Sequence, residues 1–145
     1  MTSFVSRLPV VALLAFSTLS LMAQGPSPAK LEGEWKAVKG SRGGRELDAE
    51  HLSKVTVTIA GGTITIKEPG ISEKATLANI TAGKPGTVDL VIDIKGKSAT
   101  LEGIFELDGD DLALCLSKLP EKGTRPKGFE ATAESVSLLR LKRVK

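Results

Sequence analysis

The segment LEGEWKAV, residues 31–38, contains the only tryptophan of the chain, two residues after a glycine. One parity of this segment holds Leu31, Gly33, Trp35 and Ala37, whereas the other parity holds the charged Glu32, Glu34 and Lys36. A period of two is typical of a β-strand that buries one of its faces. We therefore predict a strand whose Trp35 side chain points into a core, with Gly33 leaving room beside it on the same face.

The same alternation recurs along the rest of the chain. Further strands are expected at residues 55–60, 63–67, 74–80, 87–94, 98–107, 111–118 and 135–144. Gly61-Gly62 is a two-residue hairpin signal, and residues 47–54, with Asp48 as a cap, form the one plausible helix. Because closing a sheet removes its exposed edges, we predict an all-β fold. It is an antiparallel up-and-down β-barrel of about eight strands, with one short helix after the first strand.

One position departs from the alternation of the last expected strand. Leu138 and Leu139 are adjacent apolar residues in a segment that otherwise alternates. An extra residue on one strand is how a β-bulge disturbs a ladder. We therefore predict a β-bulge at Leu138-Leu139.

The N-terminus has the pattern of a secretory signal peptide. Arg7 precedes an apolar run over residues 8–19, and Ala23 suits the position before cleavage. The run is shorter than the ~20 residues that span a bilayer, although an uncleaved N-terminal anchor is the alternative. We expect a periplasmic or extracellular protein without stable membrane insertion after signal removal. The expected divisions are a signal peptide (1–23), a linker (24–30) and a barrel domain (31–145).

Composition argues against nucleic acid as a partner. The chain has 20 Lys and Arg against 17 Asp and Glu, and the two signs are mixed along it. After residue 23 the only aromatic residues are Trp35, Phe105 and Phe129, too few for a series of base-stacking platforms. The single cysteine, Cys115, forms no intramolecular disulfide, so core packing must hold the fold together.

The chain lacks a convincing catalytic or metal-binding set. Asp48 and His51 lie on one face of the expected helix, but a zinc site needs three or four protein ligands. The aspartates of residues 108–111 surround a glycine, and this pattern indicates a hairpin turn rather than a calcium loop. Cys115 has no nearby base and reads as a small packing residue. We expect no enzyme activity, no cofactor and no metal.

A pair of carboxylates in one expected strand leads to the same conclusion. Glu102 and Glu106 have the parity opposite to Leu101 and Phe105. Successive side chains of a strand alternate between its two faces. Both carboxylates are therefore expected to point to solvent, outside the barrel interior.

Four motifs together resemble one family. They are LEGEWKAV (31–38), IFELDGDDLALCL (104–116), TRPKGF (124–129) and LLRLKRV (138–144). In this order they resemble a planctomycete family of small exported domains of unknown function, over residues 31–144. Gly33-x-Trp35 is also similar to the lipocalins, whose eight-stranded barrels bind small apolar molecules. That resemblance implies a basic residue of the last strand across the tryptophan face, and Arg140 is the best match. Gly33, Trp35 and Arg140 would then form a structural latch.

Two functions follow from these expectations. The first is non-catalytic binding of a small apolar ligand in the barrel, although side chains can also fill a barrel of this size. Its expected lining is Val57, Ile59, Ile66, Leu90, Ile92, Leu101, Phe105 and Leu114. The alternative is a protein-interaction or inhibitor module that uses the 119–129 loop, with Arg125, Pro126 and Phe129 on its surface. An exposed Phe129 would favour the second function, and a Phe129 folded back as a lid or plug the first.

Overall fold

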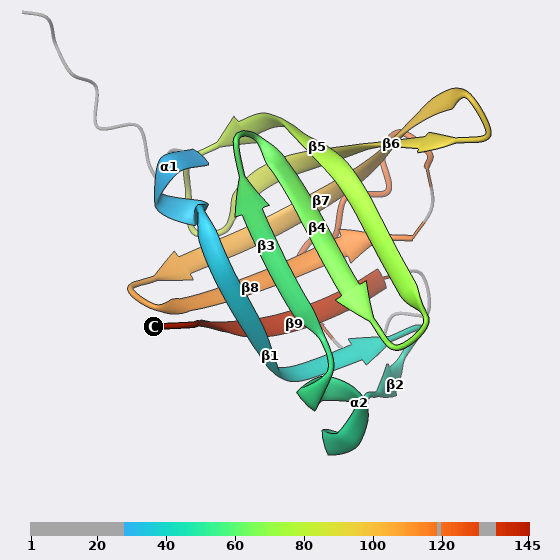
Figure 1. The fold of residues 1–145 in the computed structure, drawn as a ribbon. Helices are drawn as coiled ribbons and strands as arrows, with labels where there is room; N and C mark the ends of the chain where they lie inside the picture. Colours follow the sequence, from blue (N-terminus) through green and yellow to red (C-terminus); the bar gives the residue numbers. More distant parts are fainter. Residues whose placement is uncertain (1–27, 119, 131–135) are drawn as a thin grey trace, which may run out of the picture.

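The strands of the protein form one closed barrel (Figure 1). A computed structural model describes residues 28–118, 120–130 and 136–145, so the expected signal peptide and residues 24–27 of the expected linker lie outside the described residues. The elements are α1 (Pro28–Leu31), β1 (Gly33–Arg42), β2 (Arg45–Glu46), α2 (Ala49–Ser53), β3 (Thr56–Ala60), β4 (Thr63–Glu68), β5 (Ile71–Thr81), β6 (Gly86–Ile94), β7 (Lys97–Asp108), β8 (Asp111–Ser117) and β9 (Val136–Arg143).

The topology is the predicted up-and-down meander. Each strand from β3 to β8 pairs antiparallel with the next in the chain, and β1 pairs with both β3 and β9. These pairings close an eight-stranded barrel, and β2 adds only a short hairpin to β1. One short helix, α2, follows the first strand, so the predicted fold class is confirmed.

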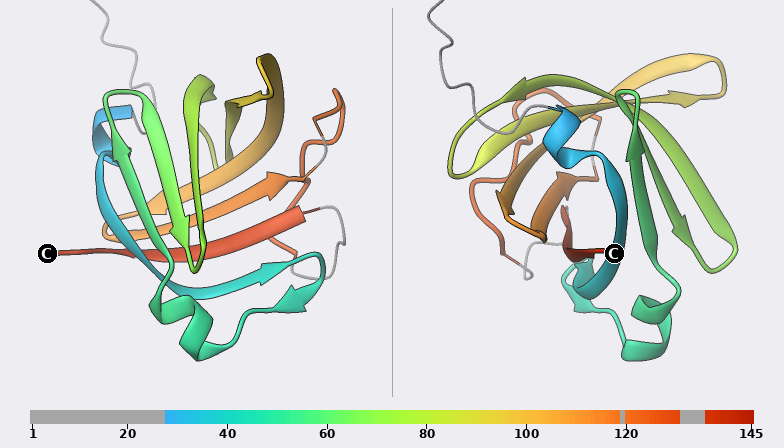
Figure 2. Two further views of the ribbon diagram at one scale, coloured as in Figure 1. Left: turned by 45° about the vertical axis from the view of Figure 1, so that its right-hand side comes forward. Right: turned by 60° about the vertical axis from the view of Figure 1, so that its left-hand side comes forward.

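The two helices lie at opposite ends of the barrel (Figure 2). The last residues of the expected linker form the helical turn α1 instead, directly before β1. At the other end, α2 starts after Asp48, whose Oδ1 accepts a hydrogen bond of 2.7 Å from the His51 backbone N–H. The predicted Asp48 cap is therefore confirmed, because this bond satisfies one of the free N–H groups of the first turn.

The predicted β-bulge at Leu138-Leu139 is wrong. β9 pairs with β8 without interruption, and Leu139 and Leu138 lie opposite Leu114 and Cys115. Both faces of β9 are buried here. Leu139 belongs to the interior core, and Leu138 packs in a second apolar cluster on the outer wall. Two adjacent leucines therefore reflect burial of both faces of a regular strand.

The irregularity lies in β1 instead. Its register with β9 shifts between Ala37 and Lys39, so Val38 is an additional residue, 60% exposed. A bulge of this kind changes which parity faces the core. Beyond it the inward parity includes Gly40, where an added Cβ would lie 3.0 Å from the Leu139 side chain. The next residue of that parity is Arg42.

Trp35 closes one end of the barrel. Its ring is fully buried, and Nε1 donates a 3.0 Å hydrogen bond to the Leu31 carbonyl oxygen in α1. The Arg143 guanidinium lies 4.3 Å from the ring centroid. Arg143 also donates to the carbonyl oxygens of Glu32, at 2.6 Å, and Lys30, at 2.9 Å. The latch therefore joins the first strand, the last strand and the helical turn before the barrel.

The prediction that Arg140 is the latch residue is wrong. Arg143 lies directly opposite Trp35 in the β1–β9 register, whereas Arg140 lies opposite Lys39 and is exposed. Parity explains the difference, because the inward parity of β9 includes the buried Leu139 and Leu141 and continues to Arg143. Gly33 leaves space for the Arg143 guanidinium, because an added Cβ would lie 2.8 Å from Arg143 Nη1. Its φ of +135° also favours glycine.

We predict that Arg143→Ala lowers the free energy of unfolding by about 1–2 kcal/mol, because it removes the cation–π contact and two charged hydrogen bonds. Urea unfolding followed by Trp35 fluorescence measures this change. Arg140→Ala is the matched control on the same strand and should change stability by no more than about 0.5 kcal/mol. Equal losses in the two variants would contradict the assignment of the latch.

Candidate functional site

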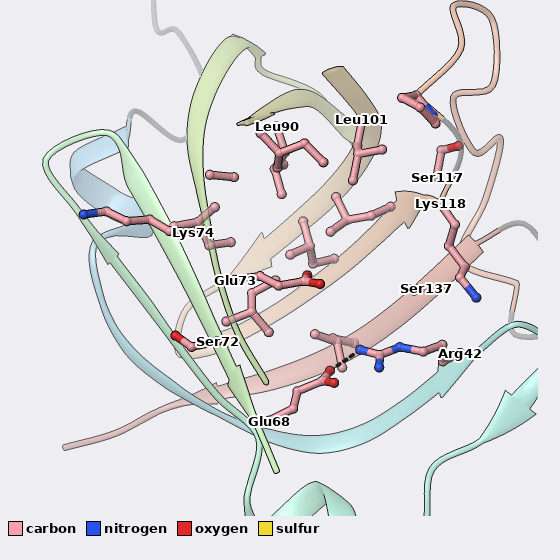
Figure 3. A pocket seen from close by; sticks show the side chains of 18 of the residues that line it. Arg42, Glu68, Ser72, Glu73, Lys74, Leu90, Leu101, Ser117, Lys118 and Ser137 are labelled. Atoms are coloured by element: carbon pink, nitrogen blue, oxygen red, sulfur yellow. Dashed lines mark hydrogen bonds and ion pairs between the residues drawn. The ribbon is translucent and has the colours of Figure 1, made fainter. Parts of the chain in front are cut away.

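The end of the barrel opposite Trp35 is hollow. A cavity of about 590 Å³ lies between the far end of β1 and strands β4 to β9 (Figure 3). Its apolar lining is Leu47, Ile64, Ile66, Ala75, Leu90, Ile92, Ile94, Leu101, Leu114, Leu116, Pro120 and Leu139. Its polar lining is Ser41, Arg42, Glu68, Ser72, Glu73, Lys74, Asp93, Ser117, Lys118 and Ser137. The polar residues lie mostly near strand ends, so they surround the mouth, which opens between the β4–β5 and β6–β7 hairpins.

Five of the eight residues expected to line a ligand site do line this cavity. They are Ile66, Leu90, Ile92, Leu101 and Leu114. Val57, Ile59 and Phe105 are also buried in the interior core, but outside the cavity lining.

These three residues fill the closed end of the barrel. Val57 pairs with Trp35 and Ile59 with Gly33, which places both in the layer around the tryptophan. Phe105 packs so tightly against Gly86 that a Cβ there would lie 2.7 Å from its Cζ. The interior is therefore divided into a packed half and an open half.

A buried carboxylate lies at the cavity mouth. Glu68 follows Ile64 and Ile66 on the inward parity of β4, and its side chain is only 2% exposed. Burying a charge is costly unless a partner compensates it. Arg42 supplies this partner through a hydrogen bond and ion pair between Nη2 and Glu68 Oε1, drawn as a dashed line in Figure 3. The Arg42 side chain is 39% exposed, so it connects the buried carboxylate to the mouth.

The second oxygen of Glu68 faces helix α2. His51 Nε2 lies 4.0 Å from Glu68 Oε2, which is too long for a hydrogen bond. Both atoms are buried and lack a hydrogen-bond partner among the described residues. His51 Nε2 therefore faces Glu68, whereas the Asp48 side chain caps the helix. In the described ranges, no group of three or more His, Cys, Asp and Glu could hold a metal ion.

The sequence interpretation missed both Arg42 and Glu68. The parity of Ile64 and Ile66 continues to residue 68 and could have indicated an inward carboxylate. Arg42 could not be found in this way. Regular alternation from Trp35 and Ala37 leads to residues 39 and 41, and the bulge at Val38 shifts the inward parity to Arg42.

We predict that Arg42→Met lowers the free energy of unfolding by about 2–3 kcal/mol, because it leaves the Glu68 carboxylate buried without a cation. The double variant Arg42→Met/Glu68→Leu should recover most of this loss, since it removes the charge together with its partner. Urea unfolding curves of the two variants and the native chain test this. A double variant no more stable than Arg42→Met would contradict the pairing.

The segment expected to form an exposed interaction loop is attached to the outer wall. Arg125 Nη2 forms ion pairs with Asp89, at 2.7 Å, and Glu102, at 3.1 Å. Its Nη1 donates to the carbonyl oxygens of Val88, at 3.3 Å, and Gly103, at 2.8 Å. The prediction of a surface-presented Arg125 is therefore wrong. Its guanidinium satisfies groups on the outer faces of β6 and β7.

Glu102 is part of the same attachment. Its Oε1 accepts hydrogen bonds from the backbone N–H groups of Gly123, at 2.6 Å, and Thr124, at 3.1 Å. Glu102 does face away from the barrel interior, as predicted, but the 120–125 segment covers it. The expectation that it points to solvent is therefore wrong, since the parity of a strand does not show what covers its outer face.

Phe129 folds back onto the outside of the barrel. It is half-buried and packs against the second apolar cluster, which consists of Ile104, Cys115, Val136 and Leu138. Pro126 is half-buried as well. Phe129 is therefore neither an exposed contact nor a lid over the cavity. Cys115 is a buried packing residue, as expected, and burial raises the pKa of its thiol.

The carboxyl of Asp89 shows the strength of this attachment. Burial raises its pKa, but hydrogen bonds from Asn79 and Arg125 outweigh burial and hold the pKa below the usual value. The Asn79 amide donates to Asp89 Oδ2 at 3.0 Å, and Arg125 donates to Oδ1. The ionised Asp89 carboxylate therefore stabilises the folded state.

We predict an acid-dependent loss of stability that originates at Asp89. Because its pKa is lowered on folding, its contribution is complete above the ordinary value of about 3.9 and is lost as the pH falls through the lower folded value. Unfolding free energies measured between about pH 5 and pH 2 should decline less steeply for Asp89→Asn than for the native chain. Arg125→Ala should lower stability at neutral pH and reduce the same slope. If the unfolding free energy of Asp89→Asn declined with falling pH as steeply as that of the native chain, the assignment of this effect to Asp89 would be contradicted.

The aspartates of residues 108–111 form the β7–β8 hairpin turn, as predicted. Asp110 lies 2.9 Å from Lys145 Nζ and 3.4 Å from Arg143 Nε. A hydrogen bond from Lys145 lowers the pKa of Asp110. The turn therefore anchors the chain end beside the latch.

Comparison of the chain with protein-family models, with curated proteins and with solved structures finds no match. The resemblance to the planctomycete family therefore stays a prediction. Within the part of the chain that the structure describes, no helix is long and apolar enough to cross a membrane.

Proposed function

We propose that the protein is a non-catalytic binding protein that holds one small, mainly apolar molecule in the open half of its barrel. The observation that carries this proposal is the cavity of about 590 Å³ opposite Trp35. Its volume lies within the range of roughly 300–1,000 Å³ that is typical of small-molecule sites. Leu and Ile side chains from five strands supply most of its inner wall.

The distribution of polar groups supports an amphipathic ligand. Leu90 and Leu101 lie on one side of the cavity, Arg42 and Glu68 lie on the other, and the Glu73 side chain points into the space between them (Figure 3). An apolar body would replace water against the leucines, and a polar end would remain beside the charged side chains. A ligand of this shape satisfies both regions without burying an unpaired polar group.

The location of this activity is part of the proposal. Residues 1–23 have the signal-peptide pattern described above, so we propose that the protein binds its ligand in the periplasm or outside the cell. The interaction-module alternative has less support. Arg125 and Phe129, on which it depended, contact the barrel wall.

We predict that the native protein takes up N-phenyl-1-naphthylamine, a neutral dye whose emission rises in apolar surroundings. Ala75→Phe should weaken this binding at least about tenfold, because the added ring occupies space inside the cavity that Ala75 lines. Dye titration with each variant measures the change, and Trp35 emission confirms folding.

The matched control for this experiment lies on the outer wall. Thr65→Phe adds a similar ring on β4, whose residue 65 has the outward parity, so its dye affinity should equal that of the native chain. No dye uptake by the native protein, or equal uptake by Ala75→Phe, would overturn the proposed function.

A further inference from the structure

The cavity mouth has exposed apolar residues on its two hairpins. Ile71 at the β4–β5 hairpin and Ile94 at the β6–β7 hairpin are each 47% exposed. Ile94 also lines the cavity, and Ile71 pairs with Glu68, another lining residue. The apolar inner wall therefore continues past the last barrel layer onto the outer edge of the mouth. We call residues 67–74 and 93–98 the mouth hairpins.

Lysines accompany these isoleucines. Lys67, Lys95 and Lys97 are exposed on the mouth hairpins, and Lys74 and Lys118 are exposed and line the cavity. Two exposed carboxylates, Glu73 and Asp93, accompany the five lysines, and Glu68 is already paired with Arg42. The exposed charge of the mouth hairpins and of the lysines that line the cavity is therefore net positive.

The hairpin turns at the Trp35 end differ in composition. They contain Gly61-Gly62, residues 82–85 and residues 108–110, and none of these described turns has a large exposed apolar residue. Exposed isoleucines beside lysines thus distinguish the turns of the open end from those of the closed end. The combination of exposed isoleucine and lysine is therefore particular to the mouth hairpins and is not shared by the described turns at the Trp35 end.

We propose that the mouth hairpins dock the protein onto the surface of a bilayer that contains anionic lipids. Apolar side chains flanked by lysines are the combination that binds such a surface, because the apolar groups enter the interface and the cations contact phosphates. With the mouth against the bilayer, Ile94 and Ile71 would connect the acyl chains directly to the cavity wall. The passage of a ligand between the bilayer and the cavity rests on the proposed function, whereas docking itself needs no ligand.

Sedimentation with lipid vesicles tests this proposal. The exported form of the protein is mixed with vesicles of phosphatidylglycerol and phosphatidylcholine in equal parts, and with vesicles of phosphatidylcholine alone. We expect the protein to sediment with the anionic vesicles and to remain in solution with the neutral ones. Raising the salt from about 0.1 M to about 1 M should release it, since the Debye length falls from about 10 Å to about 3 Å.

Two pairs of matched variants locate the contact. Lys95→Glu/Lys97→Glu should reduce partitioning by about fivefold or more for each lysine, while the same change at the exposed Lys36 and Lys84 should have little effect. Ile71→Ser/Ile94→Ser should reduce partitioning about tenfold. Val38→Ser/Val144→Ser removes exposed valines away from the mouth and should leave partitioning unchanged. All variants share one N-terminus, so its contribution cancels in each comparison.

The outcomes separate docking from ligand binding. Failure of the native protein to bind anionic vesicles, or equal losses in the mouth variants and their controls, would overturn docking but leave dye uptake unaffected. Vesicle binding without dye uptake would support docking and overturn the proposed function. Capture of another protein through the mouth hairpins, without vesicle binding, would replace the bilayer with a protein partner and overturn this proposal.

Discussion

The rest of the barrel depends on the junction between β1 and β9, which Arg143 reinforces by stacking on Trp35. A closed sheet must join its first and last strands, and here this junction is reinforced by a cation 4.3 Å from an aromatic ring. The same guanidinium binds two carbonyl oxygens in and beside α1, so the segment that enters the barrel is held by the strand that ends it. Gly33 is required here because an added Cβ would occupy the space of Arg143 Nη1.

Closing one end in this way permits the other end to stay open. Trp35, Phe105 and the neighbouring valine and isoleucine fill the first half of the interior, so that half can supply most of the packing. The second half then tolerates a cavity and a buried carboxylate, which would weaken a barrel without the packed half. The outer wall contributes as well, because Arg125 ties the 120–130 segment across β6 and β7.

The sequence predicted those features that depend on local alternation and turn chemistry. Strand order, the α2 cap, the inward face of Trp35 and the turn at residues 108–111 follow from neighbouring residues alone. The latch arginine was misassigned, because choosing between Arg140 and Arg143 requires the register between β1 and β9, which are far apart in the sequence. Arg125 was misassigned because its acidic partners lie on strands 23 and 36 residues away, and parity does not reveal what covers an outer face.

The bulge at Val38 determines which residues at the far end of β1 face the cavity. Its side chain is mostly exposed, and many residues could replace it without disturbing the core. The bulge that accommodates this residue is nevertheless what places Arg42, and not Ser41, on the inward parity with Glu68. If β1 kept its length but lost the bulge and paired regularly, residue 42 would face outward and the Glu68 carboxylate would lose its cation. The pairing of Arg42 with Glu68 therefore depends on the backbone bulge at position 38 and not on the side chain that Val38 carries.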